Sequence, residues 1–109
     1  MTVPEPIRAH LPFDEEWLAA WCLRWQVAEL AFFGSVLRDD FRPDSDVDVL
    51  IRFSDLSRWS LLDHIAMEDE LAAFFGRKVD LVSKRAVEAS RNPIRRQHIL
   101  GSAQVVYAA

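Results

Sequence analysis

Hydrophobic and polar positions follow two periods along the chain, one typical of helices and one typical of strands. Apolar residues recur at helical spacing within residues 14–25, which begin with three acidic side chains and predict an amphipathic helix. The apolar run 27–33 predicts a buried strand. Residues 46–53 alternate between two faces, one of them wholly apolar, and predict a second strand.

The second half of the chain continues in the same way. Residues 57–75 predict the longest helix, and Gly76 follows where a C-terminal cap is expected. The remaining predictions are a turn or one helical turn over 35–40, a loop over 42–45, a strand over 78–82, helices over 84–90 and 93–100, the latter ended by Gly101, and an edge strand over 103–107. This order predicts an α/β sandwich on a small sheet.

Length and composition indicate one globular domain. The chain has 109 residues, of which 50 % are hydrophobic and 28 % are charged, so disordered and low-complexity classes are excluded. Three prolines within residues 1–12 predict an extended lead-in, which leaves 13–109 as a single domain. The uncharged run 30–37 is too short to span a bilayer. With one cysteine and no signal-peptide pattern at the start, we expect a cytoplasmic protein without a disulfide or a cysteine-based zinc site.

Charge is spread unevenly along the chain. Residues 77–98 hold seven basic and two acidic side chains, a balance of +5; because the whole chain carries −4, the remainder carries −9. Such a division suits a phosphate ligand held through a metal ion, or a charged protein partner. For the basic segment alone, a solvated helix face is the simpler interpretation.

Asp46 and Asp48 are the first candidates for chemistry. They lie two residues apart on a predicted strand, so their carboxylates leave the same face. Two such anions repel each other unless a cation or a proton lies between them. Mg²⁺ fits this arrangement, since it typically takes one or two carboxylates together with substrate phosphates. An isolated pair of this kind is more often two exposed aspartates at the end of a strand.

Gly34 and Ser35 follow directly after the first predicted strand and add a second signal. Glycine permits a tight turn and a close approach of the backbone to a ligand. If a helical turn begins there, its free N–H groups face an anion, and the Ser35 hydroxyl adds one more donor. Without other residues, this pair would be an ordinary turn at the end of a strand.

The combination is more specific than either part. A Gly-Ser pair, nine residues, and then Ser45-Asp46-Val47-Asp48 opening a strand resembles the signature of the polymerase-β-type nucleotidyltransferase superfamily. The resemblance is greatest to its smallest branch, the minimal nucleotidyltransferases (MNT domains), and covers most of residues 27–107. Within it, Asp80 matches the third carboxylate of the superfamily. The resemblance implies a polymerase-β-like α/β fold, with a small mixed sheet of three or four strands and helices packed on it.

The resemblance also implies an activity. Nucleotidyltransferases move a nucleoside monophosphate from a nucleoside triphosphate, here expected to be ATP, to a hydroxyl group. Two Mg²⁺ ions would be held by three carboxylates, those of Asp46, Asp48 and Asp80, and Asp80 could accept the proton of the hydroxyl. The nucleotide would be bound by Gly34, Ser35, Arg38 and Ser45, and less surely by Arg42.

Small MNT proteins are commonly paired with an all-helical HEPN toxin. The resemblance therefore implies an antitoxin that adenylylates a tyrosine of its HEPN partner and binds it, without direct binding of nucleic acid. Two departures stand near the site, since Leu37 replaces a commoner small residue and Asp39 stands where the branch usually carries glycine. Neither touches the three carboxylates.

Two alternatives stay open. The chain could be a non-catalytic antitoxin that neutralises its partner by binding, through the basic segment or through Trp17, Trp21 and Trp25, which share one helix face. Core packing is the simpler interpretation of that face. The chain could also be a nucleotidyltransferase that acts on the hydroxyl of a small molecule.

Overall fold

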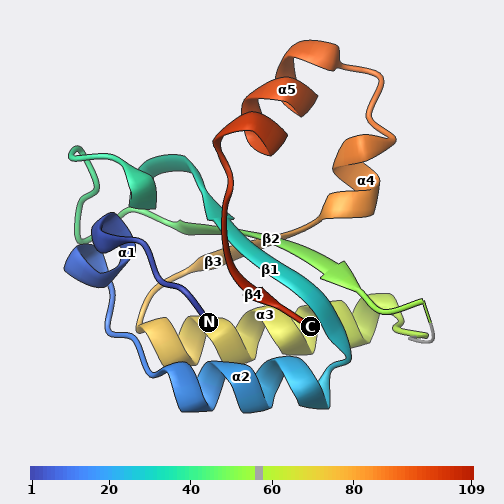
Figure 1. Cartoon of the computed structure of the whole chain (residues 1–109), viewed down its shortest axis with the longest axis horizontal. Coiled ribbons are helices and arrows are strands. Elements are labelled where there is room, and N and C mark those ends of the chain that lie inside the picture. Colours follow the sequence, from blue (N-terminus) through green and yellow to red (C-terminus); the bar gives the residue numbers. More distant parts are fainter. Residues whose placement is uncertain (56–57) are drawn as a thin grey trace.

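A mixed four-stranded sheet forms the centre of the molecule (Figure 1). The computed structural model describes residues 1–55 and 58–109. The strand order is β3-β2-β1-β4, in which β1 (Val27–Phe33) pairs antiparallel with β2 (Val47–Phe53) and with β4 (Gln104–Ala108). β3 (Val79–Ser83) pairs parallel with β2. The predicted α/β fold, its mixed sheet and the edge strand near the C-terminus are confirmed.

Helices cover both faces of this sheet (Figure 1). They are α1 (Glu5–His10), α2 (Glu15–Arg24), the 3₁₀ turn η1 (Gly34–Leu37), α3 (Leu61–Phe75), α4 (Lys84–Glu88) and α5 (Pro93–Ser102). α2 and α3 lie side by side beneath one face, whereas α4 and α5 stand over the other. An ion pair between Lys84 of α4 and Glu29 of β1 (2.7 Å) ties α4 to the sheet.

Alternation along the strands divides the core into two apolar clusters. Val49 of β2 belongs to the larger cluster, which includes side chains of α1, α2 and α3. Its neighbour Leu50 belongs to the smaller cluster, with Val87 of α4 and Ile99 of α5. Asp48, two residues before Leu50, therefore lies on the sheet face of the smaller cluster. That face carries the candidate chemistry.

The N-terminal segment is helical where an extended lead-in was predicted. Pro4 is the N-cap residue of α1, and Pro6 lies in its first turn. A proline there breaks no helical hydrogen bond, because the first N–H groups of a helix have no partner within it. Ile7 anchors the helix in the larger apolar cluster with a fully buried side chain. Pro4 and Pro6 therefore indicate a helix start as well as they indicate extended chain, whereas Pro12 follows the helix.

Capping explains where three other helices differ from their predicted bounds. α3 begins at Leu61 because Ser60 and Asp63 form reciprocal capping contacts, and the predicted start at Ser57 lies outside the described residues. Gly76 ends α3 in the left-handed conformation (φ +70°), as predicted. Gly101 does not adopt that conformation, so α5 continues through it to Ser102. α4 ends at Glu88, two residues earlier than predicted.

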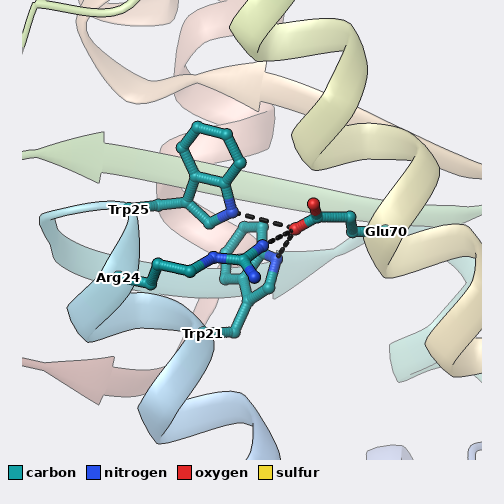
Figure 2. A network of polar contacts seen from close by, with 4 residues as sticks. All are labelled: Trp21, Arg24, Trp25 and Glu70. Atoms are coloured by element: carbon teal, nitrogen blue, oxygen red, sulfur yellow. Dashed lines mark hydrogen bonds and ion pairs between the residues drawn. The ribbon is translucent and has the colours of Figure 1, made fainter.

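A cluster of polar contacts joins α2 to α3 (Figure 2). The indole N–H groups of Trp21 and Trp25 both donate to Glu70 Oε1 at 2.9 Å, and the Arg24 guanidinium donates to the same oxygen. Trp17 stacks on Phe74 of α3 with ring centroids 4.0 Å apart. The tryptophan face of α2 is thus turned toward α3, which agrees with core packing as the simpler interpretation.

Two further observations agree with the sequence analysis. Burial raises the pKa of the Cys22 thiol to about 12, so this cysteine remains protonated and unreactive at neutral pH. Among residues 1–55 and 58–109, no helix is both long enough and apolar enough to cross a membrane.

Replacing Glu70 with alanine should lower the free energy of unfolding by about 1–3 kcal/mol, because it leaves two indole donors and a guanidinium without their acceptor. Urea denaturation measures the change. The exposed neighbour Asp69 is the control, and Asp69→Ala should change stability by less than about 0.5 kcal/mol. Equal stability of the two variants would show that the cluster contributes nothing.

Candidate active site

The end of β1 forms a tight turn at the predicted Gly-Ser pair. η1 begins at Gly34, whose φ of +78° lies in the region that favours glycine. A Cβ at this position would lie 3.2 Å from Asp48 Cγ and would collide with Asp48 Oδ2. The absence of a side chain at Gly34 therefore makes room for the Asp48 carboxylate. Ser35, the next residue, is half-buried in the same turn.

Asp46 and Asp48 follow a short turn that precedes β2. The Ser45 N–H donates to the Arg42 carbonyl, and the Arg42 N–H donates to Ser45 Oγ, both at 3.0 Å. The Ser45 hydroxyl therefore helps to close this turn, while its predicted contact with nucleotide stays a prediction. Asp46 is exposed immediately before β2, and Asp48 is half-buried within it.

Asp80 lies beside Asp48 on the neighbouring strand. In the parallel pairing of β2 with β3, Asp48 and Asp80 are Cα partners, and adjacent strands are about 4.8 Å apart. The backbone of Leu81 is held on the outer edge of β3 by two side chains of α3, because Glu68 accepts from its N–H (2.9 Å) and His64 Nε2 contacts its carbonyl (2.8 Å). α3 thus holds the strand that carries Asp80.

The charges of Asp80 and Asp46 both act on Asp48. Burial raises the pKa of Asp48, and the negative charges of Asp80 and Asp46 raise it further. The positive charge of Arg38 lowers it in part. Arg38 follows η1 and donates through Nε to Asp40 (3.1 Å), while its predicted contact with nucleotide stays a prediction.

The donor set fits a hard divalent cation, although the side chains do not yet converge on one point. Among the described residues, no three carboxylate, imidazole or thiol groups are close enough together to hold a single metal ion. Asp48 is folded against Gly34, and Asp46 lies 3.9 Å from Lys78 Nζ. Mutual repulsion favours such separation when no cation lies between the anions. The backbone register nevertheless places Asp48 and Asp80, oxygen donors of the type that Mg²⁺ prefers, on one face of adjacent strands.

A pocket of about 440 Å³ opens beside the Gly-Ser turn. It is lined from η1 and the residue after it by Gly34, Leu37 and Arg38, and from α1, α5 and β4 by Pro4, Pro6, His98, Ser102 and Gln104. Its mixed apolar and polar lining suits an organic ligand that carries charge at the end nearest Arg38. A larger cleft of about 760 Å³ lies at the other end of β2, and no predicted site residue lines it.

No local sequence pattern identified two residues that border this site. His10 of α1 contacts the Val36 carbonyl of η1 through Nδ1 at 2.9 Å. Arg77, between α3 and β3, donates to the carbonyls of Arg42 and Ser45. These contacts join residues 26 to 35 positions apart, which local patterns do not relate.

Comparison with known proteins identifies the family. Residues 15–105 match the model of the nucleotidyltransferase domain, and the chain belongs to this family. It is similar to the protein adenylyltransferase MntA of Thermococcus cleftensis, with 41 % identity over 66 residues, which are 61 % of this chain and 65 % of that protein. A Methanocaldococcus jannaschii protein, provisionally named protein adenylyltransferase MJ0128, is 34 % identical over 76 residues, 70 % of this chain and 72 % of its own. For MntA and two further relatives, the match spans only 63–65 % of the relative's length.

Solved structures share the fold. One, provisionally described as a minimal nucleotidyltransferase, has a TM-score of 0.63 at 34 % identity and covers 82 % of this chain and 85 % of its own. A toxin–antitoxin complex with AMP-PNP has a TM-score of 0.67 at 16 % identity, covering 89 % and 75 %. A complex of a tri-AMPylated Shewanella oneidensis HEPN toxin with its MNT antitoxin has a TM-score of 0.59 at 16 % identity, covering 87 % and 70 %. At such low identity these two complexes show the fold alone.

Gly34→Ala should destabilise the protein by about 1–3 kcal/mol, since alanine is strained at positive φ. It should also displace Asp48, because the Asp48 carboxylate occupies the space of the new methyl group. We expect at least a tenfold loss of Mg²⁺-dependent AMP-PNP binding by calorimetry. Gly101→Ala is the matched control, because its Cβ meets nothing within 4 Å in α5, and it should leave stability equal or up to about 1 kcal/mol higher. Unchanged nucleotide binding by the Gly34 variant would contradict the assigned role of the turn.

Asp48→Asn should stabilise the protein at pH 7 when divalent cations are removed. Folding raises the pKa of Asp48. The protonated side chain therefore adds to the free energy of unfolding at low pH, and this contribution is lost as the pH rises through the pKa of the folded state. The uncharged variant should therefore unfold at higher urea concentration than wild type at pH 7, with the difference shrinking toward pH 4. A difference of the opposite sign, or one independent of pH, would refute the raised pKa that burial and the neighbouring carboxylates give Asp48. Asp69→Asn controls for a charge lost elsewhere.

Proposed function

We propose that this chain is a magnesium-dependent protein adenylyltransferase that transfers AMP from ATP to a tyrosine hydroxyl of a cognate HEPN toxin and thereby acts as its antitoxin. The observation that carries the proposal is the register of Asp48 with Asp80, with Gly34 adjacent to Asp48 and Asp46 directly before the same strand. The name of the similar MntA protein supports the protein acceptor, and the solved neighbours with AMP-PNP and with an AMPylated HEPN toxin support the donor and the partner. A cytoplasmic setting, which supplies ATP, belongs to the same proposal.

The residues of the Gly-Ser turn bind and orient the triphosphate. The N–H groups at the start of η1 and the Ser35 hydroxyl donate to phosphate oxygens. Arg38, which already influences Asp48, pairs with a phosphate oxygen through its guanidinium fork. The pocket beside η1 receives the nucleoside end of ATP. This arrangement holds the α-phosphorus near the three carboxylates.

Asp46, Asp48 and Asp80 would hold two Mg²⁺ ions. When bound, these ions neutralise the triphosphate and stabilise the attacking and leaving oxygens of an in-line displacement. In that displacement the tyrosine oxygen forms a bond to the α-phosphorus, the bond from the α-phosphorus to the bridging oxygen breaks, and pyrophosphate leaves. Asp80, exposed at the outer strand, accepts the proton of the tyrosine hydroxyl.

Label transfer from ATP to the purified cognate toxin tests this proposal. Label in the α-phosphate should appear on the toxin, whereas label in the γ-phosphate should not, since adenylyl transfer and phosphoryl transfer move different phosphorus atoms. Asp48→Asn and Asp80→Asn should each lower the rate more than roughly 100-fold, because even outer partners of a metal site contribute about 10–100-fold. Asp69→Asn, the same chemical change on an exposed face of α3, should transfer label at the wild-type rate.

The remaining outcomes separate the alternatives. If an Asp46→Asn/Asp48→Asn double variant still neutralises the toxin, then neutralisation depends on binding and the catalytic proposal fails for the antitoxin role. If the α label moves to an added small alcohol or sugar but not to the toxin, then the acceptor is a small molecule. Absence of label transfer from every nucleoside triphosphate, with the folded wild-type protein and magnesium present, would overturn the enzymatic assignment.

A further inference from the structure

Arg77 binds the turn that leads into the catalytic aspartates. It follows Gly76, the C-cap of α3, and precedes β3. Its Nη1 donates to the Arg42 carbonyl (2.9 Å) and to the Ser45 carbonyl (3.2 Å). Its guanidinium carbon lies 4.4 Å from the centroid of the Phe41 ring. One half-buried side chain therefore contacts both ends of the Arg42–Ser45 turn and the residue before it.

Phe41 connects this contact to the Gly-Ser turn. The His10 ring lies 4.9 Å from the Phe41 ring, centroid to centroid. The same imidazole donates through Nδ1 to the Val36 carbonyl of η1, because a carbonyl can only accept. Arg77, Phe41 and His10 thus link three segments: the start of β3, the turn before β2, and η1. These segments carry Asp80, the pair Asp46 and Asp48, and Gly34.

The role of Arg77 is distinct from that of its neighbour Lys78. Lys78 approaches Asp46 directly, with Nζ 3.9 Å from Oδ2, and so supplies positive charge to the carboxylate cluster. Arg77 instead uses its donors on backbone carbonyls. A planar guanidinium holds such donors in fixed directions while it stacks on an aromatic face, which a flexible ammonium group does not reproduce. Arg77 therefore acts on the position of the turn and not on the charge of the site.

We propose that Arg77 is a positioning residue of the site: through the Arg42–Ser45 turn and Phe41, it sets the placement of Asp46 and Asp48 relative to Gly34. The inference rests on the proposed function for its catalytic meaning, since the aligned groups are those that would hold magnesium and nucleotide. The contacts themselves make a structural prediction that holds whether or not the chain is an enzyme.

Two measurements on Arg77→Ala and Arg77→Lys test the proposal. The first is amide hydrogen exchange at Arg42 and Ser45, whose N–H groups close the turn. The second is the affinity for AMP-PNP with Mg²⁺, measured by calorimetry well below the melting temperature. In Arg77→Ala we expect both amides to exchange about tenfold faster and the affinity to fall about tenfold. Arg77→Lys keeps a cation over Phe41 and should lie between Arg77→Ala and wild type.

Arg24→Ala is a matched control. Arg24 also bonds oxygen through its guanidinium, to Glu70, and also lies over an aromatic ring, that of Trp25 at 5.3 Å. It is part of the α2–α3 contact (Figure 2). Arg24→Ala should lower the melting temperature about as much as Arg77→Ala does. It should leave the rate of amide exchange at Ser45 and the affinity for AMP-PNP unchanged. If Arg77 only stabilised the fold, Arg77→Ala would behave like Arg24→Ala. A difference between the two variants in exchange and affinity therefore shows that Arg77 positions the turn.

The outcomes are decisive in each direction. Wild-type exchange rates at Arg42 and Ser45 in a folded Arg77→Ala protein would overturn the proposal. Faster amide exchange with unchanged affinity for AMP-PNP would also overturn the proposal, because Arg77 would then position the turn without any effect on the site. If the wild-type protein itself binds no AMP-PNP with Mg²⁺, the proposed function fails, while the exchange measurement still decides whether Arg77 positions the turn. Should Arg77→Ala fail to fold, Arg77→Lys decides by the same two measurements.

Discussion

The parallel pairing of β2 with β3 holds two like charges side by side, and the proposed chemistry depends on this pairing. Asp48 and Asp80 would separate if the strands slipped by one residue. Such a slip would also turn the side chains of Val79 and Leu81, which are 2 % and 4 % exposed, out of the apolar core. Burial of these neighbours therefore keeps the carboxylates together against the repulsion that raises the pKa of Asp48.

The strand that carries Asp80 is supported from outside the sheet. β3 lies at an edge, where backbone groups have no partner strand. Glu68 and His64 of α3 bind both backbone groups of Leu81, which closes this part of the edge. α3 is fixed in turn to α2 through Glu70 and its three donors (Figure 2). These contacts stabilise the packing of α2 on α3 (Figure 2), on the sheet face opposite the carboxylates.

Signals that are local in the sequence predicted most of the fold. The apolar run of β1, the alternation of β2 and the glycine that follows α3 each act within a few positions, and the structure agrees with them. The prolines around α1 were ambiguous, since the same residues suit an extended segment and the first turn of a helix. What decided the outcome was burial of Ile7, which depends on elements far along the chain.

The residues of the candidate site also divide into those that a sequence signal predicts and those that it does not. Alternation alone predicted a shared strand face for Asp46 and Asp48, and the structure places Asp48 within β2 and Asp46 directly before it. The place of Asp80 beside Asp48 came from a family resemblance. Glu68 and Arg77 carry no such signal, because their partners are backbone groups whose positions exist only in the folded chain. A sequence pattern identifies groups that would contact a ligand more readily than groups that hold those in place.

Unfavourable interactions gather at one end of the sheet. Gly34 adopts a positive φ, and Asp48 is half-buried beside two other anions. Such strain persists only where the surrounding structure over-determines it. The surrounding structure here consists of the apolar cluster beneath the sheet, the closed edge of β3 and the contacts of α1. A bound cation would turn the repulsion into attraction, and any ligand that binds only the folded state stabilises it. A cation bound between these anions would therefore stabilise the folded state at the point where their charges oppose it.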